Sequence, residues 1–162
     1  MKRHLFGLIA ALLSGCGTST PSGPSGTATM GPVAATGATA ADLAFCVTET
    51  NRYRAMVPVS PVTVSAALEA FAAEGARIDA QSSTPHAHFN DTPNVARAEN
   101  EVHRVRLATF GTVRDAIEQT LASYWNEGPS GGHYKNLTGP YSLIGCGVTI
   151  RNGELTFVQD FL

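Results

Sequence analysis

Two stretches near the C-terminus decide the fold: Gly132-His133-Tyr134-Lys135-Asn136-Leu137 and, six residues further on, Ile144-Gly145-Cys146-Gly147-Val148. A short helical segment or turn is predicted over residues 134–137, and a strand over residues 143–150. The dipeptide Asn152-Gly153 gives a strong hairpin signal, because both residues tolerate the positive φ of a type I′ turn. Residues 155–161 are therefore predicted to return as the partner strand.

Helical patterns precede these strands. Residues 42–56 place apolar or small side chains at helical spacing behind an acidic start. Pro58 and Pro61 end this helix, since neither can continue it. A second amphipathic helix is predicted from about Thr63.

The middle of the chain is less regular. Residues 81–95 are mainly Ser, Thr, Pro, His and Asn, and are predicted as loop with single turns; no element is assigned to residues 96–107. Thr112 begins a third helix, and Gly128-Pro129 ends it. Because helices come first and strands later, we predict an α+β domain rather than a βαβ repeat.

Composition limits the classes of function. Of the 162 residues, 43% are hydrophobic and 15% are charged, with 11 Lys and Arg against 13 Asp and Glu. This length suits one folded domain. The near balance of charge provides no basic surface for phosphates, so no nucleic-acid partner is expected.

The N-terminus has the pattern of an export signal. A basic start at residues 2–4 precedes an apolar run over residues 5–13, which is about half of the roughly 20 residues that span a bilayer. The tetrapeptide Leu13-Ser14-Gly15-Cys16 resembles the bacterial lipobox, in which the Cys becomes the lipidated first residue. We therefore expect a signal peptide over residues 1–15 and lipidation of Cys16.

A tether is predicted to follow the lipidated Cys, over residues 16–41. It contains no charged residue and is rich in Gly, Ser, Thr, Pro and Ala, which is typical of a flexible spacer. Gly17, directly after the Cys, favours the outer membrane of the bacterial cell envelope. The domain over residues 42–162 has nine basic and 13 acidic side chains, so the lipid rather than surface charge is expected to hold the protein at the membrane.

Two cysteines, Cys46 and Cys146, remain after Cys16. An exported protein reaches a compartment that permits disulfides, so this pair is predicted to form one bridge. The alternative is two buried free thiols, each acting as a small apolar side chain.

Several ordered stretches resemble the CAP superfamily of cysteine-rich secretory, antigen 5 and pathogenesis-related 1 proteins, whose domain is also called SCP. They are Asn51-Arg52-Tyr53-Arg54-Ala55, Ala98-Glu99-Asn100, Trp125-Asn126-Glu127, and the two C-terminal stretches quoted first. The resemblance implies an α-β-α sandwich with a small central antiparallel sheet. Two positions depart from the family pattern: Ala98 stands where the family has Gly, and Glu101 where it usually has an apolar residue.

The resemblance also implies a cleft that holds two His and two Glu: His88, Glu99, Glu127 and His133. His88 and His133 are then the expected metal ligands, and Zn²⁺ or another divalent cation the expected cofactor. His88 is preferred because it lies 11 residues before Glu99, with His86 as the alternative. His103, close to two arginines, is expected to be an ordinary solvated residue.

Three functions are compatible with this resemblance. The first is a membrane-tethered binding module whose cleft holds a divalent metal and a lipid, sterol or peptide ligand. The second is a metal-dependent hydrolase or peptidase with Glu99 or Glu127 as general base. The third is a structural or protein-interaction module of the envelope, in which the tetrad only stabilises the fold.

Overall fold

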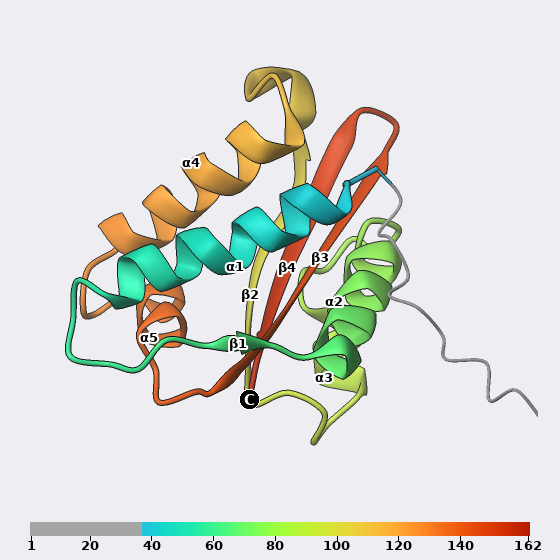
Figure 1. Ribbon diagram of the computed structural model, residues 1–162. Helices are drawn as coiled ribbons and strands as arrows, with labels where there is room; N and C mark the ends of the chain where they lie inside the picture. Colours follow the sequence, from blue (N-terminus) through green and yellow to red (C-terminus); the bar gives the residue numbers. More distant parts are fainter. Residues whose placement is uncertain (1–36) are drawn as a thin grey trace, which may run out of the picture.

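The computed structural model describes residues 37–162 (Figure 1). The predicted signal peptide, Cys16 and the tether as far as residue 36 lie outside the described residues. Helix α1 (Ala40–Arg54) begins two residues before the predicted start of the domain. Its N-terminus is fixed by Thr39, which forms a capping box with Asp42. No helix within residues 37–162 has the length and apolarity needed to cross a membrane.

A four-stranded sheet forms the centre of the domain. The order of its strands is β1 (Thr63–Val64), β3 (Leu143–Arg151), β4 (Glu154–Phe161) and β2 (Ala98–Arg106). Neighbours β3 and β4, and β4 and β2, are antiparallel, as expected. The sheet as a whole is mixed rather than antiparallel, because the two-residue strand β1 runs parallel to β3.

Helices cover both faces of this sheet, which confirms the predicted sandwich (Figure 1). Helix α2 (Ala66–Asp79) packs on one face, together with the short α3 (Ala87–Asp91). Helices α1, α4 (Val113–Asn126) and α5 (Gly132–Leu137) cover the other face. The larger apolar core lies on this second face and includes Val148, Phe157 and Phe161, none of which is exposed.

Helix α2 approaches strand β3 very closely. A Cβ atom on Gly145 would lie 2.1 Å from the backbone of Leu68, and one on Gly147 would lie 2.2 Å from the backbone of Ala72. Real Cβ contacts are never this short, so both positions require Gly. The two glycines of the quoted stretch thus set the distance between the sheet and α2.

The disulfide Cys46–Cys146 is confirmed, and it joins α1 to β3 across the larger core. Arg54, at the end of α1, is 1% exposed and makes a second long-range link. Its guanidinium donates hydrogen bonds to four backbone carbonyls: Ser60, Leu137, Gly139 and Tyr141. The bridge and this arginine together tie the first helix to the C-terminal half of the domain.

Two other predictions are confirmed in detail. Thr112 caps α4 by accepting a hydrogen bond from the backbone N–H of Asp115. The hairpin turn places Asn152 at φ 54° and Gly153 at φ 79°, the positive values that a type I′ turn requires. Strands β3 and β4 therefore pair in register up to Arg151 and Glu154.

Strand β2 was not assigned from the sequence, because its first half is rich in polar residues that rarely favour strands. Pairing with β4 nevertheless fixes it as one of the two edge strands of the sheet, opposite β1. The register shifts between Val102 and Val105, and Arg104 in this bulge has a φ of 53°. The loop over residues 81–95 contains the single helical turn α3.

Candidate functional site

The candidate site lies along the edge strand β2. Side chains alternate across a strand, so Glu99 and Glu101 face the side of α2 and α3, while Asn100 between them faces α5. Accordingly, Glu101 accepts a hydrogen bond from the loop before α3, and Asn100 donates one to the backbone of α5. Strand β2 therefore places two carboxylates on one face of the sheet and an amide on the other.

On the first side, His86 and Glu99 form a pair. The ring Nδ1 of His86 lies 2.7 Å from Oε1 of Glu99 and 3.7 Å from Oε2 of Glu101. The backbone N–H of His86 also donates to Glu101. His86 has a φ of 60°, a left-handed conformation that is uncommon for any residue but Gly. The two glutamates thus hold His86 through both its ring and its backbone.

On the second side, Glu127 and His133 form another pair. Oε1 of Glu127 lies 2.5 Å from the ring Nδ1 of His133, and Oε2 accepts the backbone N–H of His133 at 3.0 Å. Glu127 is the C-terminal cap of α4, and His133 lies in the first turn of α5. Both side chains are about one-third exposed, so solvent reaches this pair.

Two asparagines connect the two pairs. Nδ2 of Asn136 donates to the backbone oxygen of Glu99 at 2.9 Å and to Oδ1 of Asn100 at 3.0 Å. Asn100 in turn donates to the backbone oxygen of His133. Helix α5, with His133, is therefore anchored to the strand segment that carries Glu99.

Tyr124 packs on the second pair. Its ring stacks on that of His133 with centroids 4.3 Å apart. Burial raises the pKa of its hydroxyl well above the usual value, and the carboxylates of Glu101, Glu127 and Glu99 add to this effect. Carboxylates of both His–Glu pairs therefore act on the same phenol.

His88 occupies a different position from His86. Its backbone N–H donates to Oδ1 of Asp79 at 3.0 Å, and its ring packs on Phe71 with centroids 4.4 Å apart. Nδ1 of the ring is buried without a hydrogen-bond partner. His88 is thus close to the acidic groups, but it is His86 that contacts Glu99.

The electrostatics of the first side depend on burial. The hydrogen bond to Glu99 raises the pKa of His86, against an opposing effect of burial. Burial raises the pKa of Glu101 to about 7 and that of Asp160 to about 9. Asp160 lies opposite Glu99 on the neighbouring strand β4 and is fully buried.

In the second pair, hydrogen bonding has a larger effect on the carboxyl pKa than burial has. Burial opposes ionisation of Glu127, but the hydrogen bonds from the ring and backbone of His133 outweigh it and lower the pKa of this carboxyl. Glu127 is therefore an ionised acceptor that orients His133. An imidazole oriented by a carboxylate is the arrangement found at many metal and acid–base sites.

Three side chains could hold a metal ion: His86, Glu99 and Glu101. One donor atom from each lies within 4.8 Å of the other two. A nitrogen and two carboxylate oxygens suit Zn²⁺ or Mn²⁺ and leave positions open for water. Such an ion would polarise a bound water or ligand, while Glu99 and Glu101 would fix its position.

The predicted tetrad is therefore brought together in part. Glu127 pairs with His133, as the tetrad requires, but the imidazole that pairs with Glu99 is the alternative candidate His86. The asparagines described above link the two pairs. Glu101 and Asp160 were not predicted as site residues. Recognition of β2 as a strand would have indicated Glu101, because residues two apart share a face. Asp160 is the one acidic residue within an otherwise mainly apolar strand end.

No nucleophile accompanies these imidazoles. Within residues 37–162, the rings of His86 and His133 hydrogen-bond only to glutamates, and neither hydrogen-bonds to a Ser, Thr or Cys side chain. The expectation for His103 is not met, because its Nε2 hydrogen-bonds to the backbone oxygen of Asp79 at 3.0 Å.

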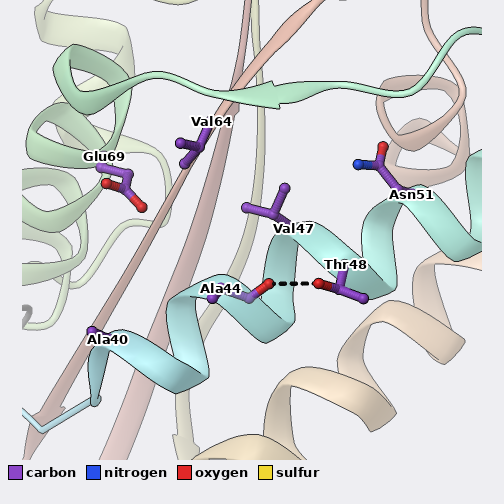
Figure 2. Close-up of a pocket in the computed structure, with 7 residues that line it drawn as sticks. All are labelled: Ala40, Ala44, Val47, Thr48, Asn51, Val64 and Glu69. Carbon is purple, nitrogen blue, oxygen red and sulfur yellow. Dashed lines mark hydrogen bonds between the residues drawn. The ribbon is translucent and has the colours of Figure 1, made fainter.

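A separate groove lies between α1, β1 and α2 (Figure 2). Its volume is about 300 Å³, and its lining is mainly small and apolar, with Glu69 at one side: Ala40, Ala44, Val47, Thr48, Asn51, Val64 and Glu69. Asn51 is occupied in fixing the backbone of Val62 on entry to β1. Val64 is 52% exposed, so the groove has an apolar wall open to solvent.

The three layers define the class of this protein as an α-β-α sandwich with two His–Glu pairs beside the edge of its sheet. The chain belongs to the CAP family, the cysteine-rich secretory protein family, whose model matches residues 47–161. No curated protein sequence matches it closely enough to count as a relative.

Two solved structures share the fold. The structure of Na-ASP-1 has a TM-score of 0.61 and 20% sequence identity, over 78% of this chain and 39% of that one. The hookworm platelet inhibitor has a TM-score of 0.53 and 17% identity, over 74% of this chain and 67% of that one. The chain thus spans well under half the length of Na-ASP-1, and identities this low show the fold alone.

Proposed function

We propose that this protein is a lipid-anchored binding module of the bacterial cell envelope whose cleft holds a divalent metal ion. The observation that carries the proposal is the group of three donor atoms from His86, Glu99 and Glu101 within 4.8 Å of one another. Family membership supports the domain type. The two His–Glu pairs along one strand edge support a ligand site rather than a purely structural network.

The choice of metal follows from the donors. An imidazole nitrogen with carboxylate oxygens favours Zn²⁺ or Mn²⁺ over Ca²⁺, which prefers oxygen alone. His86 supplies the nitrogen in this proposal. His133, held by Glu127, is the second imidazole of the cleft and the candidate for contact with a bound ligand or its water.

Calorimetric titration of Zn²⁺ into the full-length protein tests this assignment. His86→Ala is expected to abolish binding, and His133→Ala to weaken it. His88→Ala measures the role of the other predicted ligand, and His103→Ala is the control, because this ring bonds to a backbone carbonyl instead. Full binding in His86→Ala, with loss in His88→Ala, would reverse the choice between the two histidines.

The anchor is proposed from the sequence of the leader. Leu13-Ser14-Gly15-Cys16 resembles a lipobox, and Gly17 favours the outer membrane. Cys16→Ala is expected to move the protein from the membrane to the soluble fraction, with Ser19→Ala as the control. Continued membrane association of Cys16→Ala under the same fractionation would contradict the anchor.

The groove of Figure 2 supports a short apolar ligand such as a lipid tail, a sterol or an apolar peptide side chain. Its volume of about 300 Å³ is at the lower end of small-molecule pockets. Val47→Trp would fill the groove. We expect this variant to lose binding of a fluorescent fatty acid and to keep Zn²⁺ binding, whereas unchanged fatty-acid binding would remove the groove from the proposal.

A metal-dependent hydrolase is the second candidate, and the pair Glu127–His133 is the observation that favours it. This pair combines an ionised carboxylate with a partly exposed imidazole, as a general base would require. Glu127→Gln separates the candidates. Loss of turnover at Zn²⁺ concentrations that saturate the variant would indicate catalysis, and a large loss of thermal stability alone would indicate a structural tetrad.

A further inference from the structure

The outer edge of strand β1 is paired at one residue by a side chain of α1. Thr63 and Ser65 donate their backbone N–H groups to β3. Backbone groups alternate along a parallel ladder, so those of Val62 and Val64 point away from β3. There Asn51 pairs with Val62, since its Nδ2 donates to the carbonyl at 2.9 Å and its Oδ1 accepts the N–H at 2.8 Å. One amide thus completes the edge at Val62 as a neighbouring strand would.

Val64, two residues further along the same edge, is not paired in this way. Within residues 37–162, its N–H and its carbonyl form no hydrogen bond, and 52% of the residue is exposed. Val64 lines the groove of Figure 2. An unpaired N–H and carbonyl on an edge strand form a template to which another extended chain can add. The groove therefore combines its apolar wall with one backbone donor and one backbone acceptor.

The two walls of this groove differ in chemistry. Helices α1 and α2 cover opposite faces of the sheet, so a groove at the β1 edge lies between the two helices (Figure 2). The wall from α1 is apolar and includes Ala44 and Val47, whereas α2 contributes the carboxylate of Glu69. Side chains of a strand added at this edge would alternate between the two faces. One set would meet the apolar wall, and the other set would meet Glu69.

Glu69 has no positive partner among the described residues. Burial raises the pKa of its carboxyl, and no hydrogen bond or opposite charge offsets this effect. A partly desolvated carboxylate of this kind gains from a Lys or Arg side chain placed beside it. The predicted tether over residues 17–36 contains no basic residue, so this segment of the chain itself cannot supply that charge.

We propose that the groove binds an extended segment of another polypeptide, added as a strand beside β1 and carrying alternating apolar and basic side chains. Its backbone would pair with Val64, its apolar side chains would contact Ala44 and Val47, and a basic side chain would pair with Glu69. Strand addition of this kind draws affinity from the backbone and specificity from alternate side chains. The inference rests on the proposed function only in using the same groove as a ligand site, and the metal ion has no part in it.

Fluorescence anisotropy of the full-length protein tests the proposal with a labelled, blocked pentapeptide of alternating valine and lysine, in EDTA. Saturable binding is expected. The same peptide with glutamate in place of lysine should not bind. The valine-lysine peptide with methylated backbone nitrogens should bind about tenfold more weakly, because it cannot donate to the carbonyl of Val64. Both comparisons change only the ligand, so they do not depend on the folding of a variant.

Variants of the protein test the two walls. Glu69→Gln is expected to weaken binding of the valine-lysine peptide by about fivefold. Glu74→Gln is the matched control on the same helix, because Glu74 pairs with Arg77 outside the groove and its loss should leave the affinity unchanged. Val47→Trp should abolish peptide binding. Glu69 lies in the first turn of α2, where negative charge favours the helix, so thermal unfolding of Glu69→Gln is measured alongside.

The outcomes separate this inference from the proposed function. Fatty-acid binding without peptide binding would overturn the inference and leave the groove as an apolar site, whereas binding of neither would overturn both uses of the groove. Equal affinity for the methylated peptide, or peptide binding that persists in Val47→Trp, would also overturn the inference. A wild-type dimer that Val47→Trp converts to a monomer would place a second copy of the chain in the groove instead. A failed Zn²⁺ titration would leave the inference standing, because peptide binding is measured in EDTA.

Discussion

Glu127 holds His133 at two points: Oε1 lies 2.5 Å from the ring Nδ1, and Oε2 accepts the backbone N–H of the same residue at 3.0 Å. This double contact fixes both the rotamer of the ring and the start of α5. It also keeps Nδ1 protonated as the donor, so the opposite nitrogen, Nε2, is left as the acceptor or metal-binding atom.

The Glu127→Gln variant therefore tests whether this carboxylate orients the ring of His133, with little effect expected on the stability of the fold. Both side chains are partly exposed, so we expect a loss of less than about 1 kcal/mol in the free energy of unfolding. Zn²⁺ affinity is expected to fall by about tenfold, as is usual when a carboxylate that orients an imidazole is removed. Calorimetry and thermal unfolding measure the two effects. Glu118→Gln, an exposed site on α4, is the control and should change neither.

The metal-free protein is expected to lose stability as the pH rises from 6 to 9. The raised pKa of His86 gives stability that is present below the unfolded value of 6.5 and lost as the pH passes through the folded value. Burial raises the pKa of Glu101 to about 7 and of Asp160 to about 9, so ionisation of these two acids also costs stability over this range. Urea unfolding in EDTA at several pH values measures the trend.

Asp160→Asn serves as the internal check of that trend. Because the amide cannot ionise, the variant should be more stable than the wild type at pH 8 in EDTA, by about 2 to 4 kcal/mol. Its stability should also depend less on pH. A wild-type stability that stays constant or increases from pH 6 to pH 9 would contradict the role assigned to these buried groups.

Two arginines two residues apart should differ strongly in their contribution to stability. Arg54→Met removes a buried guanidinium and leaves the carbonyls of Leu137 and Gly139 without a donor, so we expect a loss of about 3 kcal/mol or more. Arg52→Met removes a half-exposed guanidinium from its pair with the buried carboxylate of Glu49, and should cost less than Arg54→Met, about 1 kcal/mol. Chemical denaturation of both variants measures the difference, and equal losses would contradict this account of Arg54.

Two glycines provide a similar comparison. Gly147→Ala would place a methyl group 2.2 Å from the backbone of Ala72, so α2 would have to move away from the sheet, at a cost of about 3 kcal/mol. Gly132→Ala meets nothing within 4 Å and lies in the first turn of α5, so a change within about 1 kcal/mol is expected. Thermal unfolding measures both, and a stable Gly147→Ala would show that α2 can move.

Reduction of the disulfide should destabilise the domain. The bridge joins residues 100 positions apart, and the chain-entropy model gives a contribution of up to about 4.7 kcal/mol for a loop of this length. Denaturation with and without a reducing agent measures it, and the double variant Cys46→Ala, Cys146→Ala should match the reduced protein. A reduced protein as stable as the oxidised one would show that native contacts alone hold α1 on β3.

Much of the fold was predictable because its signals are local. The cap at Thr112, the hairpin at Asn152-Gly153 and the helical periodicity of α1 each depend on residues within a few positions of one another. The pairing of Cys46 with Cys146 was also predictable, because the chain has only one other cysteine, Cys16, and the sequence predicts that this one carries a lipid. The resemblance to the CAP family motifs added the prediction of an α-β-α sandwich.

Tertiary structure decided the rest, since it depends on pairing between distant segments. Strand β2 has a polar first half and exists because β4 offers a partner edge, and that pairing turns Glu101 toward His86 and sets Glu99 opposite Asp160. Spacing along the chain favoured His88, but the left-handed backbone of His86, held by Glu101, directs the ring of His86 to Glu99. The sequence by itself thus determined the elements and the motif residues. The choice of imidazole and the positions of the buried carboxyls depend on strand register and helix packing, which local patterns do not encode.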